Sequence, residues 1–198
     1  PQPYGCIRVL NTPNPLARVP VPSNPSSILA IVDTMTTRTL ILVRHAAAGS
    51  SSSGDRQRPL TPEGVEQARR LGRRVSRLID HVDLSLTSPA VRTQETAVQL
   101  HTSIEVRTTS VDDELYLAGA DSLLDKARSL PASVTSVMMV GHEPAISAMA
   151  ASLGARRSCK EKVRWGVPTG TAVVLTFEGN WSQLAENSCE MEVFREPA

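Results

Sequence analysis

The clearest hydrophobic pattern in the chain is the run 40–43, four consecutive large aliphatic residues that end on Arg44 and His45. The run is too short for a helix and too uniformly apolar for a strand with one wet face, so it predicts a strand buried on both faces. Such strands belong to α/β folds, in which functional groups lie just past the carboxyl ends of strands. Arg44 and His45 are therefore candidate site residues.

A second strongly apolar strand is predicted over 136–140, and it ends on Gly141 and His142. The arrangement repeats that of the first run, because a histidine again stands at a strand-to-helix turn. His142 is therefore a third candidate.

Arg92 is the fourth candidate. A strand over 82–86 leads into Ser88 and Pro89, which we expect to cap and to open a helix that reaches about residue 100. Arg92 then lies in the first turn of that helix, a place suited to an anion. Taken alone, it is better explained as a surface arginine.

The rest of the pattern alternates helices with strands. Thr61 and Pro62 begin a helix whose apolar positions continue to Ile79, with His81 at its carboxyl end, and Asp121 is expected to cap a later helix. Further helices are predicted over 121–130 and 144–153, and further strands over 104–107, 171–177 and 190–194, the last two as a terminal hairpin.

Residues 1–34 differ from the rest, since they hold seven of the fourteen prolines and show no helical or strand periodicity. We expect a poorly ordered arm over 1–34 and one domain over 35–198. The arm is either a natural extension or sequence upstream of a start at Met35.

Composition removes several classes of function. The formal net charge is +1 and aromatic residues make up 3%, which indicates neither a basic groove nor stacking platforms for nucleic acid. The three cysteines, Cys6, Cys159 and Cys189, are too far apart in the sequence for a zinc motif or a disulfide framework. Because no apolar run near the N-terminus is long enough for a membrane span or a signal peptide, we expect a cytoplasmic protein that does not bind membrane. We also expect a monomer without a nucleic-acid partner.

Two other segments resemble ligand sites but fail on their details. The Ser-rich loop 46–58 is not a phosphate-binding P-loop, because Asp55 stands where the lysine should be. The adjacent carboxylates of Asp112, Asp113 and Glu114 favour a solvated turn over a metal site, since neighbouring residues rarely converge on one ion. We expect no metal and no cofactor.

The four candidates follow three predicted strands whose carboxyl ends face the same crevice. A histidine nucleophile needs a neutral ring nitrogen, and nearby guanidinium groups lower its pKa while they bind phosphoryl oxygens. At about 4 Å and an effective dielectric constant near 20, each such charge stabilises a bound unit charge by about 4 kcal/mol. The pattern therefore predicts phosphoryl transfer without a metal.

Four segments of the chain also resemble motifs of the histidine phosphatase superfamily, and within it the phosphohistidine phosphatases of the SixA-type branch. They follow one another at residues 42–46, 58–64, 88–97 and 140–144, and the match extends from about residue 38 to the C-terminus. The resemblance implies a phosphoglycerate mutase-like fold, an α/β three-layer sandwich with a mostly parallel central sheet flanked by helices. It makes residues 35–198 a histidine phosphatase domain.

By this resemblance His45 attacks phosphorus and becomes phosphorylated, while Arg44, Arg92 and His142 hold the phosphoryl oxygens. Water then releases phosphate. Many family members also carry a glutamate that protonates the leaving group, and the corresponding place here falls near Leu117, which is apolar.

The missing acid bears on the substrate. Glu114 and Asp121 lie close in sequence without matching the family's pattern, and Ser51 is a further secondary candidate. General acid catalysis contributes about 10²–10⁴-fold, which an enzyme acting on poor leaving groups needs. We therefore expect phosphohistidine on a protein as the substrate.

Two alternatives remain. One is a phosphatase of small phosphorylated metabolites that uses Glu114 or Asp121 as its acid. The other is a phosphoprotein-binding module without turnover, against which the presence of all four core residues argues.

Overall fold

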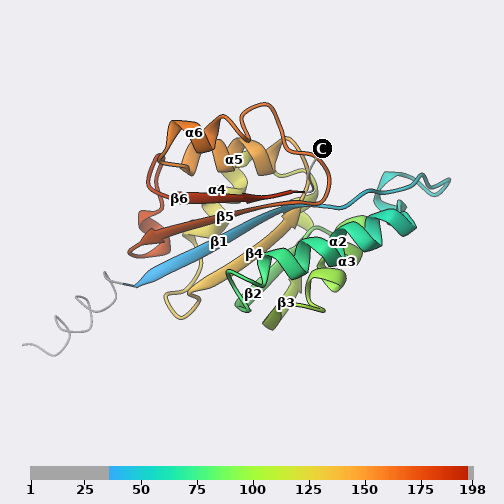
Figure 1. Ribbon diagram of the computed structural model, residues 1–198, viewed down its shortest axis with the longest axis horizontal. Coiled ribbons are helices and arrows are strands. Elements are labelled where there is room, and N and C mark those ends of the chain that lie inside the picture. The colour runs from blue at the N-terminus through green and yellow to red at the C-terminus, as the bar shows by residue number, and fades with distance from the viewer. Residues whose placement is uncertain (1–35, 196–198) are drawn as a thin grey trace, which may run out of the picture.

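The computed structural model describes residues 36–195, so the predicted arm over 1–34 and the start at Met35 lie outside the described residues. The described residues are built around one six-stranded sheet in the order β3-β2-β4-β1-β5-β6 (Figure 1). The strands are β1 (Thr37–Arg44), β2 (His81–Thr87), β3 (Glu105–Val111), β4 (Ser136–Gly141), β5 (Thr171–Glu178) and β6 (Glu190–Phe194).

The first four strands of the sequence pair in parallel with one another, whereas β5 is antiparallel to β1 and β6 is antiparallel to β5. The predictions of a mostly parallel sheet and of a terminal hairpin are confirmed.

Helices cover both faces of the sheet and complete the three layers. One face carries α2 (Pro62–Val75) and α3 (Val91–Leu100); the other carries α4 (Ala120–Arg128), α5 (Ala145–Leu153) and the short α6 (Arg157–Lys160). Three 3-10 turns, η1 (Asp55–Gln57), η2 (Asp113–Tyr116) and η3 (Trp181–Gln183), lie in the connections. Among residues 36–195, no helix is long and apolar enough to cross a membrane.

The predicted central strand is buried on both faces. Leu40 and Leu42 pack into the core beneath α4 and α5, while Ile41 and Val43 pack into the core beneath α2 and α3. All four side chains are fully buried. Burial of each such side chain stabilises the fold by about 1.5–3 kcal/mol, so this strand anchors both layers and fixes the residues that follow it.

The first predicted helix begins as expected and ends early. Thr61 caps α2, since its Oγ1 accepts from the main-chain N–H of Gly64 at 3.0 Å. The helix ends at Val75 and not at Ile79. Residues 76–78 form a turn in which the N–H of Leu78 donates to the Val75 carbonyl three residues back, and Ile79 packs against the core beneath α2 and α3.

His81 was placed wrongly at a helix end. It is the first residue of β2, and its Nε2 lies 3.4 Å from Asp83 Oδ1. The turn after α2 separates His81 from the helix, so the carboxylate, and not the helix dipole, faces the ring.

Neither Ser88 nor Asp121 caps a helix as predicted. The N-cap of α3 is Ala90, which leaves the Ser88 hydroxyl free to contact His142. The N-cap of α4 is Gly119, so Asp121 falls within the first turn, where its side chain is exposed.

Candidate active site

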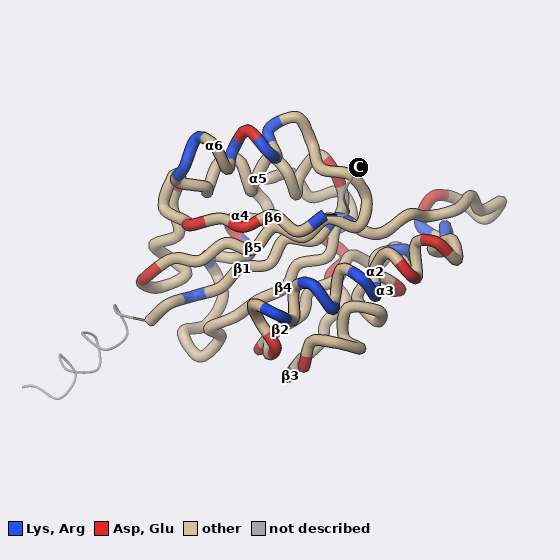
Figure 2. The backbone as a smooth tube through the Cα atoms, viewed as in Figure 1, with Lys and Arg blue, Asp and Glu red and all other residues tan. Residues whose placement is uncertain are grey.

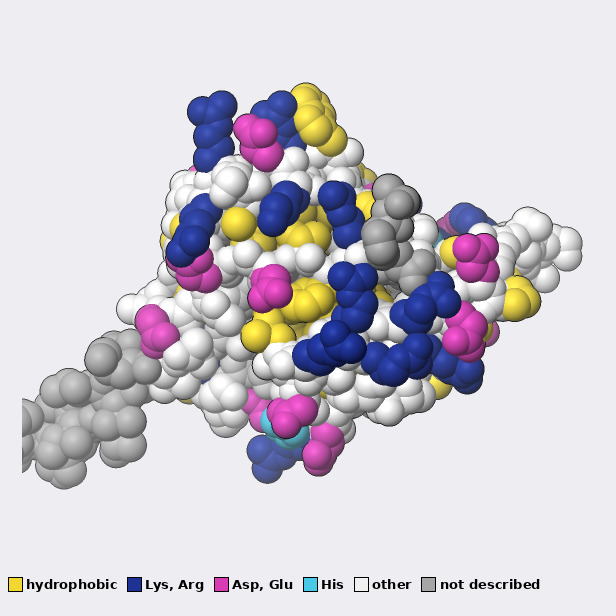
Figure 3. All heavy atoms as spheres, viewed as in Figure 1, with side chains coloured by type: hydrophobic (Ala, Val, Ile, Leu, Met, Phe, Trp, Pro, Cys, Tyr) yellow, Lys and Arg dark blue, Asp and Glu magenta, His cyan; other side chains and the backbone are white. Residues whose placement is uncertain are grey.

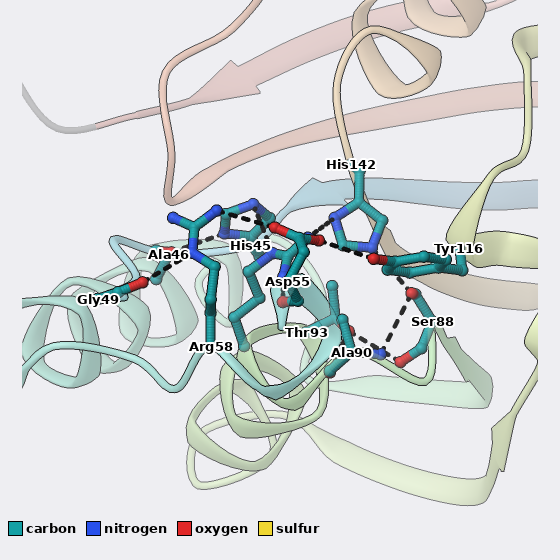
Figure 4. Close-up of polar contacts among 11 residues, drawn as sticks. His45, Ala46, Gly49, Asp55, Arg58, Ser88, Ala90, Thr93, Tyr116 and His142 are labelled. Atoms are coloured by element: carbon teal, nitrogen blue, oxygen red, sulfur yellow. Dashed lines mark hydrogen bonds and ion pairs between the residues drawn. The ribbon is translucent and has the colours of Figure 1, made fainter. Parts of the chain in front are cut away.

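The carboxyl ends of β1, β2 and β4 bring the four predicted core residues together (Figure 4). Arg44 ends β1 opposite Gly141 of β4, so His45 and His142 leave the sheet at paired positions. Their ring centroids lie 5.4 Å apart in an edge-on arrangement. Arg92 stands between them, with Nε 3.3 Å from His45 Nε2 and Nη2 3.4 Å from His142 Nδ1.

The hydrogen bonds of His45 define which ring nitrogen carries the proton. Nδ1 lies 2.8 Å from the carbonyl oxygen of Ala46, which can only accept, so Nδ1 donates. In the neutral ring Nε2 then holds the free electron pair, and it accepts from the Arg92 guanidinium. Burial is the largest cause that lowers the pKa of His45 to about 4; the Ala46 carbonyl opposes it, and Arg92, Arg44 and nearby Arg58 reinforce it.

His142 has the opposite tautomer. Because a guanidinium only donates, Nδ1 accepts from Arg92, and Nε2 donates to Ser88 Oγ at 2.8 Å. Burial, followed by the charge of Arg92, lowers the pKa of His142 to about 4. Both rings are therefore neutral at physiological pH.

Arg44 has a buried nitrogen without a protein acceptor. Nη1 donates to the carbonyl of Val167 at 2.5 Å, whereas Nε is buried and unpaired. A buried donor left unpaired costs about 1–3 kcal/mol, more when it is charged, so this N–H is suited to an anion.

Asp55 belongs to the site. The sequence placed it in the loop 46–58 but gave no reason to count it as a site residue. Arg92 donates to it twice, through Nη1 to the main-chain oxygen at 2.6 Å and through Nη2 to Oδ2 at 2.9 Å. Tyr116 donates to the same Oδ2 at 2.7 Å, and Arg58 Nη1 lies 3.1 Å from Oδ1. The Tyr116 hydrogen bond, then those from Arg92 and Arg58, hold the pKa of the Asp55 carboxyl well below its usual range.

Tyr116 is the second residue that was missed. It ends η2, and its ring stands edge-on to His142 with centroids 5.6 Å apart. The Arg56 guanidinium lies 4.4 Å from the centre of the tyrosine ring. The available signal for Asp55 and Tyr116 was their position on connections at the carboxyl edge of the sheet, where site residues concentrate.

The secondary candidates lie apart from the four core residues. Glu114 pairs with Lys126 at 2.6 Å, and Lys126 also binds Asp112 at 2.8 Å. Asp121 is exposed on α4, and Ser51 Oγ accepts from the N–H of Ser53 within the loop. Within residues 36–195, the polar contacts of Glu114 and Ser51 are with Lys126 and Ser53 and not with a core residue, and no group of three His, Cys, Asp or Glu side chains could hold a metal ion.

Comparison with known proteins gives a consistent result. The model of the histidine phosphatase superfamily (branch 1) matches residues 40–116. A solved structure of a candidate phosphohistidine phosphatase SixA from Nakamurella multipartitia is 35% identical, with a TM-score of 0.69, over 84% of this chain and 100% of that one.

Two further matches extend the comparison. An uncharacterised protein of Mycobacterium leprae is 30% identical over 146 residues, which cover 72% of this chain and 89% of that protein. The phosphoglycerate mutase of Plasmodium falciparum shares the fold with a TM-score of 0.53. Its sequence is 16% identical, and the match covers 81% of this chain and 91% of that one. The predicted phosphoglycerate mutase-like fold is therefore confirmed.

Proposed function

Because the chain belongs to the histidine phosphatase superfamily, as a phosphatase of its SixA-type branch, we propose that it removes phosphate from phosphohistidine on a protein. His45 is the nucleophile in this proposal. The observation that carries it is the tautomer of His45, whose Nδ1 donates to the Ala46 carbonyl and whose Nε2 faces the Arg92 guanidinium with a free electron pair.

In the first step His45 Nε2 attacks phosphorus, and the bond from phosphorus to the substrate nitrogen breaks. The electron pair of that bond returns to the substrate imidazole. Arg44 Nε, which has no protein acceptor, binds one phosphoryl oxygen, and the Arg92 guanidinium binds the others. His142 acts through Arg92, because its Nδ1 accepts from that guanidinium and holds it in place. The phosphorylated ring of His45 becomes positively charged, and the Ala46 carbonyl stabilises it through Nδ1–H.

In the second step water attacks the phosphorus on His45. The bond from phosphorus to Nε2 breaks, its electron pair returns to the ring, and the water protons leave on phosphate. His45 is then neutral again with its proton on Nδ1, so the cycle closes without a metal or a redox partner.

The proton donors near the leaving group support phosphohistidine as the substrate. Leu117, at the place of the family's acid, is exposed, and Glu114 is held by Lys126. The carboxylate that does reach the site belongs to Asp55, and its lowered pKa keeps it ionised. A substrate imidazole leaves from phosphorus more readily than an alcohol does, so phosphohistidine fits this site better than a phosphate monoester.

The test is to mix the enzyme with a protein phosphorylated on histidine, with and without chelator, and to quench it within the first turnover. We expect acid-labile phosphate on the chain that depends on His45 and is unaffected by chelator. His101→Gln is the matched control, because His101 Nε2 contacts Ser85 Oγ at 3.1 Å and not the site. Turnover that survives His45→Ala would falsify the assignment, and inhibition by chelator would point to the carboxylates of residues 112–114 as a metal site.

The substrate is tested separately with phosphoramidate and a sugar phosphate. We expect the wild-type enzyme to hydrolyse phosphoramidate and to leave the sugar phosphate nearly untouched. Faster hydrolysis of the sugar phosphate, lost on changing Glu114 or Asp121, would establish the alternative of a phosphatase of small metabolites.

A further inference from the structure

We propose that Leu117 and Trp165 form a docking surface for a folded phosphoprotein with an acidic face, one on each side of the active site. This inference rests on the proposed function, since it concerns how the same site selects a protein that carries phosphohistidine.

The first observation is exposure. Five large apolar side chains are exposed among residues 36–195, and three of them, Leu78, Val98 and Val111, are between 52% and 60% exposed. Leu117 and Trp165 are 87% and 84% exposed. Tryptophan in particular contributes most to binding where proteins meet, and a side chain so exposed is suited to such a contact.

The second observation is where Leu117 lies. It directly follows Tyr116, whose ring contacts His142 and whose hydroxyl binds Asp55. Leu117 also lines a surface hollow of about 650 Å³ together with Arg56, Lys126 and the carboxylates of Asp113, Glu114 and Asp125, so the acidic residues of the partner have to face Trp165 and not this flank. This flank of the site therefore offers an apolar contact beside an open hollow.

Trp165 lies on the other flank. The segment after it runs along the site, because Val167 accepts from Arg44 and the N–H of Gly170 donates to the carbonyl of His45. The Arg164 guanidinium lies 4.5 Å from the centre of the tryptophan ring, so the indole is bordered by a positive charge.

The segments that carry the two side chains meet at the turn of His142 and Glu143. The ring of Tyr116, which precedes Leu117, stands edge-on to His142, and Gly166, which follows Trp165, lies beside the Glu143 carboxylate. A protein that presents phosphohistidine at this turn contacts Leu117 and Trp165 around the phosphate, whereas a small metabolite reaches only the core residues.

The charge around Trp165 indicates the chemistry of the partner. Residues 156–164 contain five basic side chains and one acidic one, and Figure 2 shows the basic residues along α6 and the turn after it. In Figure 3 their dark blue side chains project from the surface over α6. A protein with acidic residues beside its phosphohistidine complements this flank and is attracted to it over a distance.

The experiment compares two substrates, a protein phosphorylated on histidine and phosphoramidate. We expect Trp165→Ala and Leu117→Ala each to lower kcat/KM for the phosphoprotein about tenfold, chiefly through KM, and to leave phosphoramidate hydrolysis within twofold of wild type. Val98→Ala, which removes an exposed apolar side chain from α3, is the matched control and should change neither rate.

Charge is tested in the same assay. Lys162→Glu should raise KM for the phosphoprotein, and the effect should weaken at high salt, whereas Arg73→Glu on α2 should not. Equal slowing of both substrates by Trp165→Ala and Leu117→Ala, or no effect on either, overturns the docking surface. If wild-type enzyme hydrolyses phosphoramidate but never the phosphoprotein, the proposed protein substrate itself fails, which is a separate result.

Discussion

Asp55 holds both terminal nitrogens of Arg92, one through its main-chain oxygen at 2.6 Å and the other through its carboxylate at 2.9 Å. The guanidinium that we expect to bind phosphate thus already carries an anion from the loop after β1. Incoming phosphate has to share Arg92 with this carboxylate or displace it, so Asp55 competes with substrate and product for the same cation.

Asp55→Asn should therefore strengthen inhibition by inorganic phosphate. The Asp55 side chain is 52% exposed, which limits the effect, and we expect the inhibition constant to fall about twofold to fivefold. Asp113→Asn is the control, because that carboxylate pairs with Arg56 at 3.7 Å and is almost fully exposed. A fall in kcat with unchanged phosphate inhibition would instead mean that Asp55 only positions Arg92.

The rate should depend little on pH between 6 and 8. His45 must be neutral to attack, and its pKa, like that of His142, is lowered to about 4, so both rings lose their protons well below neutrality. Activity should fall only as the pH approaches about 4. The pH profile of kcat/KM for phosphoramidate measures this fall, once it is corrected for the hydrolysis of that compound in acid. A midpoint near 6.5 would contradict the neutral, buried rings. Arg92→Met should raise the pH at which activity falls, but only by part of the shift, because burial lowers the two histidine pKa values more than the arginine does.

The stability of the fold should also decrease as the pH falls. The two rings have lower pKa values folded than the ordinary 6.5, so the unfolded chain binds more protons between about pH 4 and 6.5. The free energy of unfolding should therefore decrease as the pH falls through this window. Urea titrations at several pH values measure it, and His142→Gln should flatten the slope.

The parts of the site that could be predicted are those fixed by the strands. Arg44, His45 and His142 follow strands with strong apolar patterns, and the parallel register of β1 and β4 then leaves little freedom in their placement. Asp55 and Tyr116 could not be placed in this way. Asp55 reaches Arg92 only because the loop 46–58 folds back over the strand ends, and no local pattern of residues encodes that path. Ser88 was assigned to a helix cap, because the sequence cannot show that a histidine 54 residues away competes for its hydroxyl.

Arg38 should matter for stability and not for chemistry. It is fully buried, and its guanidinium donates to the carbonyls of Gly179 at 2.7 Å and Val134 at 2.7 Å, with its carbon 5.8 Å from the centre of the Trp181 ring. Arg38→Lys loses the planar fork and leaves acceptors unpaired, so we expect a loss of about 2–4 kcal/mol in the free energy of unfolding. Denaturant titration measures it, and kcat per folded molecule should stay unchanged at low temperature. Arg73→Lys, on the exposed face of α2, should change neither quantity.

Ser88 should matter for chemistry through His142. Its Oγ accepts from His142 Nε2 at 2.8 Å, which fixes the tautomer that leaves Nδ1 facing Arg92. Ser88→Ala removes this acceptor and lets the ring protonate on either nitrogen, so we expect kcat for phosphoramidate to fall about fivefold to tenfold, equivalent to roughly 1 kcal/mol. Ser85→Ala is the matched control, because Ser85 is a buried serine that contacts His101 in the same way at 3.1 Å but lies outside the site. If both variants lower kcat equally, the effect of Ser88 is a general loss of packing. If only Ser88→Ala lowers it, and Ser88→Thr restores it, the hydroxyl positions His142 against Arg92.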